Sequence, residues 1–423
     1  MTVRLGEAAL HARARDLREE TSPPLSPRGI FPGWYVVAGA FLVLMVGFGA
    51  IYSYAAFAEG IAAEFGSSRG SVTLVYALSG ASCFFVSALT GPLADRIGAR
   101  VLAGAGMLLV GLGLMVAATA RTLVEVYVGY GVLTGLGTGF AYVPAMAAVQ
   151  RWFVAHRGLA SGLAVSGIGI GTALVPPATD ALSVLGDWRV AFVASGALAA
   201  LVGLGGAALL RPVPGRAPEC PARPTPPPVV GGRDFAFAYA GTLLVSLPAT
   251  LPHALLVATA RDLGIGWHEA VALLGLIGLG TIAGRCAIAV LADAVGRRGV
   301  FLACCAGMAM SMLVWALAAD EAVLQAFALG FGALQGGFVA LLPAFVADSF
   351  GARSVGGVLG VLYTSRGVAL LAAPPALAFG IALLAGHALP LVAIAALGMA
   401  GTLLLARVRR GAVSAAAPPA DRR

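Results

Sequence analysis

Stretches of about 20 apolar residues recur along the whole chain, separated by short charged or Pro- and Gly-rich breaks. Each stretch is long enough to cross the ~30 Å hydrocarbon core of a bilayer as a helix. The sequence therefore predicts an all-α membrane protein. Twelve spans are expected near residues 32–57, 70–94, 101–120, 122–148, 158–181, 189–210, 235–260, 268–292, 299–319, 321–347, 354–380 and 387–407.

The composition excludes several other classes of protein. Of the 423 residues, 59% are hydrophobic and only 11% are charged, whereas a soluble domain carries about 25% charged residues. A soluble fold of this size would have to bury nearly all of its apolar side chains in one or two cores. We therefore exclude a soluble enzyme, a secreted disulfide scaffold and a nucleic-acid-binding domain, although the net charge is +8.

The domain organisation follows from one Pro-rich interruption. Residues 211–233 carry charges and many prolines without helical periodicity, and they are interpreted as a cytoplasmic linker. The linker separates two predicted six-helix halves, 32–210 and 234–407. Residues 1–31 and 408–423 are the expected cytoplasmic tails.

The positions of the basic residues predict the orientation. All 27 basic residues are arginines, and 21 of them fall in the tails, the linker and the even-numbered loops. The odd-numbered loops hold only Arg69, Arg121, Arg189 and Arg261. Because loops rich in Arg and Lys stay on the cytoplasmic side, both termini are expected in the cytoplasm.

An internal repeat relates the two halves at an offset of 198 residues. The matched segments are Leu93-Ala94-Asp95 with Leu291-Ala292-Asp293, Gly139-Phe140 with Gly337-Phe338, and Pro176-Pro177 with Pro374-Pro375. Parallel six-helix repeats with a cavity between them at the membrane midplane are a known transporter architecture.

The loop after the second span carries a family signature. GPLADRIGAR (91–100) resembles the loop motif of the major facilitator superfamily, and LADAVGRR (291–298) resembles a degenerate second copy. The resemblance implies a transporter rather than an enzyme, with the major facilitator fold. It also implies cytoplasmic gating loops whose charges hold the carrier closed on that side: Asp95, Arg96, Arg100, Asp293 and Arg297.

The fourth and fifth spans narrow the resemblance. The run WFVAHRGLASGLAVSGIGIG within residues 135–177 is similar to the carboxylate branch of that superfamily, which contains monocarboxylate transporters and the oxalate:formate antiporter family. GWYVV and GFGAIYSYAAF in the first span agree with it. The resemblance implies transport of small organic carboxylates by alternating access.

Two arginines lie deep in predicted spans, Arg285 in the eighth and Arg366 in the eleventh. An arginine at a helix centre costs about 2.5–3.5 kcal/mol on insertion scales, so it is retained for a reason. The middles of the predicted spans hold no Asp or Glu. A bound anion is then the natural counterion, and a guanidinium matches both oxygens of a carboxylate.

The family resemblance assigns the same two positions. Members of the oxalate:formate family bind substrate through an Arg on span 8 and a basic residue in a YTxK-like motif on span 11, which here is Arg366 of LYTSRG. Structural roles are alternatives: Arg285 could cap backbone carbonyls or reach Asp293. Arg366 could extend to the interface or bond a helix end near Pro374.

Other polar residues complete the candidate site. Tyr52, Tyr142 and Tyr363 match family positions that line the site, although tyrosines are also common at membrane interfaces. Gln335 is a further polar candidate. His253 is either a carrier of a coupling proton, because histidine titrates near neutral pH, or a packing residue beside a proline.

The expected function is a carboxylate carrier of the oxalate/formate exchange type, because an empty carrier with two bare positive charges should reorient poorly. The alternative is a proton-coupled symporter of a monocarboxylate such as lactate or pyruvate. The uncharged first span weighs against it, since many monocarboxylate transporters carry an essential Lys there. An anion sensor and a drug or sugar carrier are further alternatives.

The expected partners follow from this function. They are a small carboxylate anion, the lipid bilayer and, in the symport alternative, protons. No nucleic acid, cofactor or metal is expected, and the protein is expected to be a monomer. Its expected location is the inner (plasma) membrane, as a multi-pass protein.

Overall fold

The computed structural model describes residues 31–153, 157–184, 187–212, 232–350, 355–384 and 386–409. Nearly all of each predicted tail and most of the predicted linker lie outside these residues. The side chains of Asp95 and Asp293 also lie outside the described part, so two of the predicted gating residues are placed only by their backbone.

The described residues form helices joined by short turns. They are α2 (Gly33–Tyr52), the 3₁₀ turn η1 (Ser53–Ala56), α3 (Ala58–Phe65), α4 (Arg69–Ile97), α5 (Ala99–Ala118), α6 (Leu123–Val126), the π-helix η2 (Tyr127–Thr134), α7 (Gly135–Trp152), α8 (Arg157–Val184), α9 (Trp188–Leu198), the π-helix η3 (Ala199–Gly203), α10 (Leu204–Leu209), α11 (Arg233–Asp262), α12 (Trp267–Val295), α13 (Arg297–Ala316), α14 (Glu321–Phe350), α15 (Val355–Leu383) and α16 (Ala388–Arg407).

The prediction of twelve spans is confirmed. Twelve helical segments in the described part of the chain are long and apolar enough to cross a membrane. The first runs over Gly33–Ala56 and the last over Ala388–Arg407, within a residue of the expected bounds. The agreement reflects the strength of the constraint, because a backbone in hydrocarbon must satisfy its hydrogen bonds within its own helix.

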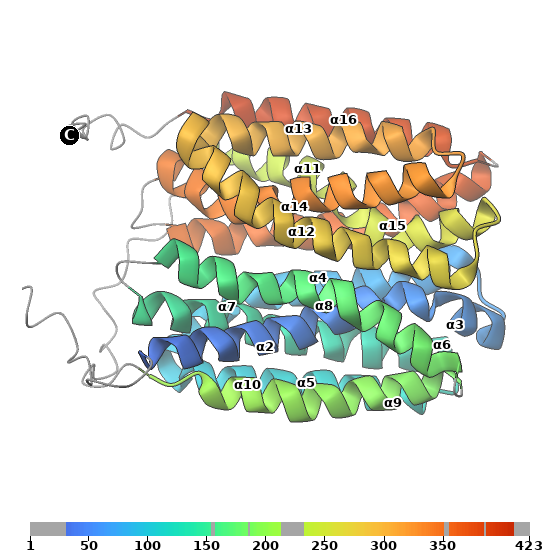
Figure 1. Ribbon diagram of the computed structural model, residues 1–423, viewed down its shortest axis with the longest axis horizontal. Coiled ribbons are helices and arrows are strands. Elements are labelled where there is room, and N and C mark those ends of the chain that lie inside the picture. Colours follow the sequence, from blue (N-terminus) through green and yellow to red (C-terminus); the bar gives the residue numbers. More distant parts are fainter. Residues whose placement is uncertain are drawn as a thin grey trace, which may run out of the picture.

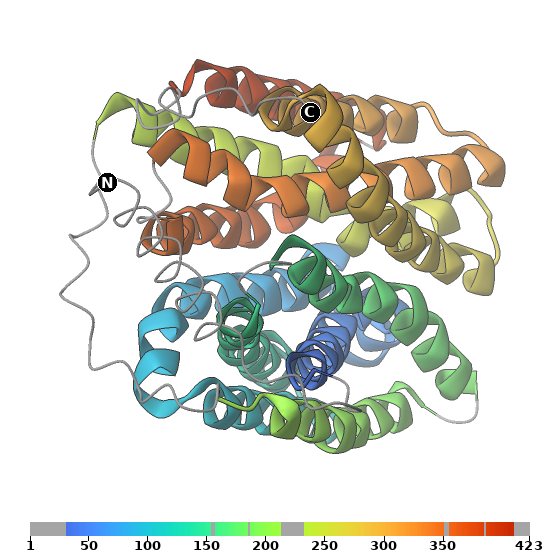
Figure 2. The ribbon, with the colours of Figure 1, turned by 60° about the vertical axis from the view of Figure 1, so that its left-hand side comes forward.

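The spans form two groups that lie against each other (Figures 1 and 2). The elements from α2 to α10 make one group, here called the N half, and those from α11 to α16 make the other, the C half. In Figure 1 the helices run roughly horizontally. α2 begins and α16 ends at the left, here called the tail end; the opposite end is called the far end.

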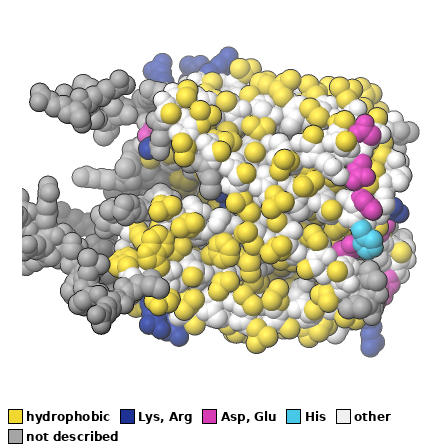
Figure 3. Space-filling view, viewed as in Figure 1, with side chains coloured by type: hydrophobic (Ala, Val, Ile, Leu, Met, Phe, Trp, Pro, Cys, Tyr) yellow, Lys and Arg dark blue, Asp and Glu magenta, His cyan; other side chains and the backbone are white. Residues whose placement is uncertain are grey.

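Apolar side chains cover the flank of the bundle between its two ends. In Figure 3 charged side chains gather toward the tail end and the far end, with a broad apolar surface between them. Leu89, Leu201 and Phe379 are examples of large apolar residues that are more than two-thirds exposed. A surface of this kind fits lipid acyl chains rather than water.

The 198-residue repeat reappears in the turns between helices. Gly98 and Gly296, which follow α4 and α12, have φ angles of 91° and 119°. Gly66 and Gly264, which follow α3 and α11, have φ angles of 56° and 82°. Glycine adopts positive φ without steric cost, so the same turn solution recurs at equivalent places in both halves.

Within the C half, α12 and α14 pack through glycines spaced four residues apart. A Cβ added at Gly280 or Gly284 of α12 would overlap backbone atoms of α14, and one added at Gly332 or Gly336 would overlap backbone atoms of α12. Helices in membranes approach this closely only where small residues remove the side chains between them. This contact fixes α12 against α14, and these helices carry Arg285 and Gln335.

Candidate functional site

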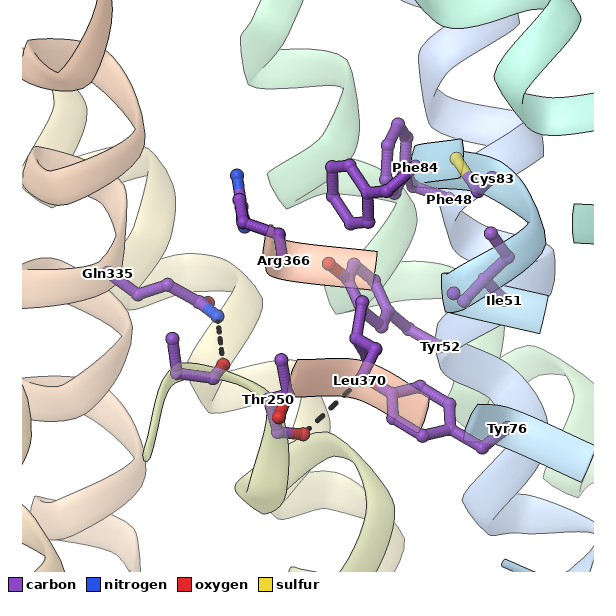
Figure 4. Close-up of a pocket in the computed structure, with 12 residues that line it drawn as sticks. Phe48, Ile51, Tyr52, Tyr76, Cys83, Phe84, Thr250, Gln335, Arg366 and Leu370 are labelled. Atoms are coloured by element: carbon purple, nitrogen blue, oxygen red, sulfur yellow. Dashed lines mark hydrogen bonds between the residues drawn. The ribbon is translucent and has the colours of Figure 1, made fainter. Parts of the chain in front are cut away.

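A small pocket lies between the two halves near the middle of the bundle (Figure 4). It is lined by Phe48, Ile51, Tyr52, Tyr76, Gly80, Cys83, Phe84, Ala249, Thr250, Gln335, Arg366 and Leu370. The N half contributes residues of α2 and α4, and the C half contributes residues of α11, α14 and α15. The space left among these side chains is about that of one water molecule.

Arg366, one of the two arginines predicted to bind substrate, supplies the charge of this lining. The residue is 6% exposed on α15. Its guanidinium carbon lies 4.6 Å from the ring centroid of Phe84, 5.6 Å from that of Phe338 and 5.9 Å from that of Tyr363. Aromatic faces attract a cation at such distances.

Arg366 has hydrogen-bond donors that the described residues do not use. The ion pairs found among the described residues do not include it, and its Nε has no hydrogen-bond partner there. Aromatic rings stabilise the positive charge but cannot accept its in-plane N–H donors. The site therefore offers buried hydrogen-bond donors to an anion.

Gln335 lines the same pocket and is held in place by a backbone contact. Its side-chain Nε2 donates to the carbonyl of Ala249 on α11 at 2.7 Å. The hydroxyl of Tyr76 lies 3.5 Å from the carbonyl of Thr250 on the same helix. These bonds attach α14 and α4 to the segment of α11 between Pro248 and Pro252.

The predicted tyrosines and histidine form contacts between the halves. The ring of Tyr52 on α2 stacks on that of His253 on α11, with centroids 4.3 Å apart. The hydroxyls of Tyr142 on α7 and Tyr363 on α15 lie 3.3 Å apart. Tyr52 lines the pocket with Arg366, while His253 lies behind it.

Arg285 has a different environment from Arg366. It is 7% exposed on α12 and does not line the central pocket in this conformation. Its Nη1 donates to the backbone carbonyl of Val165 on α8, in the opposite half.

The predicted gating arginines lie at the tail end. Arg96, Arg100 and Arg297 are exposed there, near the turns that follow α4 and α12. At this end, Trp152 Nε1 donates to the Arg211 carbonyl at 2.8 Å, within the N half. Arg298 donates to the Ala406 carbonyl at 2.9 Å, within the C half.

Ion pairs join the halves at the far end. The guanidinium of Arg69, at the start of α4, donates to both oxygens of Asp262, at the end of α11, at 2.6 and 2.9 Å. The Nε of Arg261 lies 3.7 Å from Oε1 of Glu59 on α3. Each pair takes one partner from each half, so the far end is closed in this conformation.

A third connection at the far end centres on a buried carboxylate. Asp180, in the last turns of α8, is 4% exposed. One oxygen accepts a hydrogen bond from Trp267 Nε1, and the other lies 2.6 Å from His268 Nδ1. Both partners are at the start of α12, in the opposite half. We call these three residues the Asp180 cluster.

A second carboxylate at the far end is held in a similar way, but within the N half. Glu64 on α3 accepts from Trp188 Nε1 at 2.8 Å and from Arg189, both at the start of α9. The hydrogen bond from Arg189 lowers the pKa of Glu64 below its ordinary value of 4.5. We call these three residues the Glu64 cluster.

Several residues of the site were not predicted from sequence. Phe84 and Phe338 surround Arg366, but an aromatic residue in a span ordinarily indicates only packing or lipid contact. Asp180 and His268 lie at span ends, where charged residues are common.

Comparison with known proteins agrees with this architecture. Residues 39–235 match the family model described as Major Facilitator Superfamily. Monocarboxylate transporter 12-B of Danio rerio is 27% identical over 392 residues, covering 81% of this chain and 80% of that protein. Monocarboxylate transporter 3 of Rattus norvegicus is 29% identical over 363 residues, covering 81% of this chain and 73% of that protein.

A third relative matches a shorter stretch. Monocarboxylate transporter 11 of Mus musculus is 33% identical over 279 residues, covering 64% of this chain and 62% of that protein. Together with the twelve spans, these similarities identify the chain as a multi-pass membrane transporter and not an enzyme. The chain is thus similar to the major facilitator superfamily over residues 39–235 and, along most of its length, to proteins named monocarboxylate transporters.

Proposed function

We propose that this protein carries small monocarboxylate anions across the plasma membrane by alternating access, with Arg366 as the residue that binds the carboxylate. The observation that carries the proposal is a buried guanidinium with free donors that lines a pocket between the two halves. A carboxylate there would neutralise a charge that otherwise costs energy in the membrane interior.

The rest of the pocket favours one carboxylate over two. Arg366 is the charged residue of its lining, and the other walls include four aromatic rings, those of Phe48, Tyr52, Tyr76 and Phe84. Oxalate carries two carboxylates and no apolar part, so it would leave one charge without a matched cation. A monocarboxylate with a short apolar body matches both the single charge and the aromatic walls, once the pocket, which in this conformation holds about one water molecule, widens to admit it.

Exchange of the oxalate/formate type is the second candidate, and it is favoured by the presence of two deep arginines. That argument assumes that both charges are bare when the carrier is empty. Arg285 instead donates to the Val165 carbonyl, and the charge of Arg366 faces aromatic rings. These contacts favour a carrier that can reorient without substrate, as proton-coupled symport requires.

Uptake into proteoliposomes tests the proposal. Labelled lactate, pyruvate and oxalate would be offered to vesicles preloaded with lactate, oxalate, formate or buffer, with and without a proton gradient. We expect monocarboxylate uptake into buffer-loaded vesicles that a proton gradient stimulates. Oxalate uptake that requires an internal carboxylate and ignores pH would replace symport with exchange.

Substitution of Arg366 tests the binding residue. Removing one partner of a buried, hydrogen-bonded charge pair costs about 2–5 kcal/mol, so Arg366→Gln should weaken transport at least about 30-fold. Arg366→Lys should retain part of it, because the charge remains while the paired donors are lost. Arg121→Gln, at an exposed position of the far end, is the matched control. Unchanged KM in Arg366→Gln would exclude the assignment.

A further inference from the structure

The far end is closed by two kinds of contact. Arg69 with Asp262 and Arg261 with Glu59 join groups that are both ionised near neutral pH. The Asp180 cluster joins a carboxylate to an imidazole, whose charge changes between about pH 5 and pH 8. One of the connections between the halves therefore depends on a proton.

The geometry makes that proton accessible from solution. The side chain of His268 is 66% exposed, whereas that of Asp180 is 6% exposed. The imidazole can therefore exchange protons with the medium at the far end while the carboxylate stays covered. Opening this end would separate α8 from α12 and would expose Asp180 to water.

The other charged groups near His268 either have partners of their own or interact with it less strongly than Asp180 does. Glu269 adjoins it on α12 and adds a negative charge. On the elements packed against α12 at this end, Arg261 and Asp262 of α11 have their own partners on α3 and α4. Glu321 of α14 accepts from the side chain of Gln325. Asp180 is thus the group in the opposite half that interacts most directly with the charge of His268.

We propose that Asp180, Trp267 and His268 form a proton-sensitive closure of the far end, in which protonation of His268 stabilises the closed conformation. With the proton, the contact is an ion pair between imidazolium and carboxylate; without it, a neutral imidazole N–H donates to the carboxylate and the attraction is weaker. Acid at the far end thus favours the closed conformation. This inference rests on the alternating-access function proposed above.

Cys83 provides a native reporter of closure. This thiol lines the central pocket, and the far end must open before a membrane-impermeant thiol reagent can reach it from that side. The reagent would be applied to intact cells, whose exterior faces the far end if the termini are cytoplasmic. Peptide mass spectrometry would give the rate of Cys83 modification separately from that of the other cysteines.

The measured quantity is the ratio of this rate in His268→Gln to that in the wild type, at about pH 5.5 and at about pH 8. Taking the ratio cancels the intrinsic pH dependence of the thiol reaction. We expect a ratio of about two to five in acid, the range that an exposed ion pair supports, and a ratio near one in alkali. His387→Gln, another histidine at the same end, is the control and should stay near one at both values.

A double variant isolates the pair. Asp180→Asn removes the charge that His268 faces, so His268→Gln should have no further effect in that background. A ratio that is the same in acid and in alkali would overturn the proposal. Cys83 modification that is equal in His268→Gln and the wild type, or undetectable in both, would overturn it as well. Failure of the proposed function is distinguishable, because it would appear as absent carboxylate uptake by wild-type proteoliposomes whatever the ratio.

Discussion

The Asp180 cluster and the Glu64 cluster are two solutions to the same local problem at the far end. In each, a tryptophan Nε1 and the basic residue that follows it in sequence bond one carboxylate. The Glu64 cluster uses Arg189 and stays within the N half. The Asp180 cluster uses His268 and crosses between the halves.

The difference separates a structural contact from a switch. Arginine is charged at every physiological pH, so the Glu64 cluster holds α3 against α9 at every pH at which Glu64 is ionised. Histidine gains and loses its charge near neutrality. A titrating residue is useful only where the contact must form and break, and the boundary between moving halves is such a place. Four predictions test this comparison.

The largest effect is expected from removing the buried carboxylate. Asp180→Ala leaves Trp267 and His268 without their acceptor and should raise Cys83 modification from the far side by about tenfold. Glu64→Ala removes the equivalent carboxylate within one half and should leave that rate unchanged. Equal acceleration in both variants would mean that the two clusters do not differ in role.

The next effect comes from making the inter-half contact permanent. His268→Arg keeps a positive charge opposite Asp180 at every pH and should hold the far end closed. Far-side modification of Cys83 should then fall below the wild-type rate in alkali by about two- to fivefold, and should equal it in acid. A wild-type rate in alkali would contradict the comparison.

The reverse substitution, histidine for arginine in the Glu64 cluster, should make a contact within the N half depend on pH. Arg189→His gives the Glu64 cluster a cation that is present only below about pH 6.5, so this contact should weaken as pH rises through that value. We expect the melting temperature of the detergent-solubilised variant to fall by about 1–2 °C from acid to alkali, relative to the wild type. Its Cys83 modification ratio should not depend on pH.

The smallest effect concerns the wild-type Glu64 cluster in acid. Because Arg189 lowers the pKa of Glu64 below 4.5 in the folded protein, this contact stabilises the fold above the unfolded value and is lost as pH falls through the folded one. The carboxylate is 36% exposed, so the contribution should stay below about 1 kcal/mol. Melting curves of Glu64→Gln and wild type should converge as pH is lowered from 5 to about 3.

The fold was predictable because the bilayer imposes one strong rule. Apolar stretches of membrane-crossing length must be helices, and twelve of them were found where hydropathy placed them. Arg366 was predictable for the same reason, since a buried arginine in a span requires an explanation. Sequence could not separate its surroundings from those of Arg285, because Phe84, Phe338 and Val165 belong to other helices.

The Asp180 cluster shows what hydropathy misses. Asp180 and His268 are 88 residues apart and lie at the ends of their spans. A charged residue there has little insertion cost, so the sequence gives no reason to single it out. Their pairing depends on how α8 meets α12. That packing is set by small residues such as Gly169 and Gly278, whose role becomes clear only when both helices are placed.

The glycine contact between α12 and α14 has a consequence for substrate selection. With no side chains between their backbones, these two helices cannot slide or separate without losing contact along their length, so Arg285 and Gln335 keep a fixed spacing. The α12–α14 pair is thus a rigid part of the C half, and through Gln335 it supplies one fixed point of the pocket wall. Adaptation to acids of different size then falls to the aromatic residues of α2 and α4, and variation in chemical preference among related carriers should concentrate on those two helices.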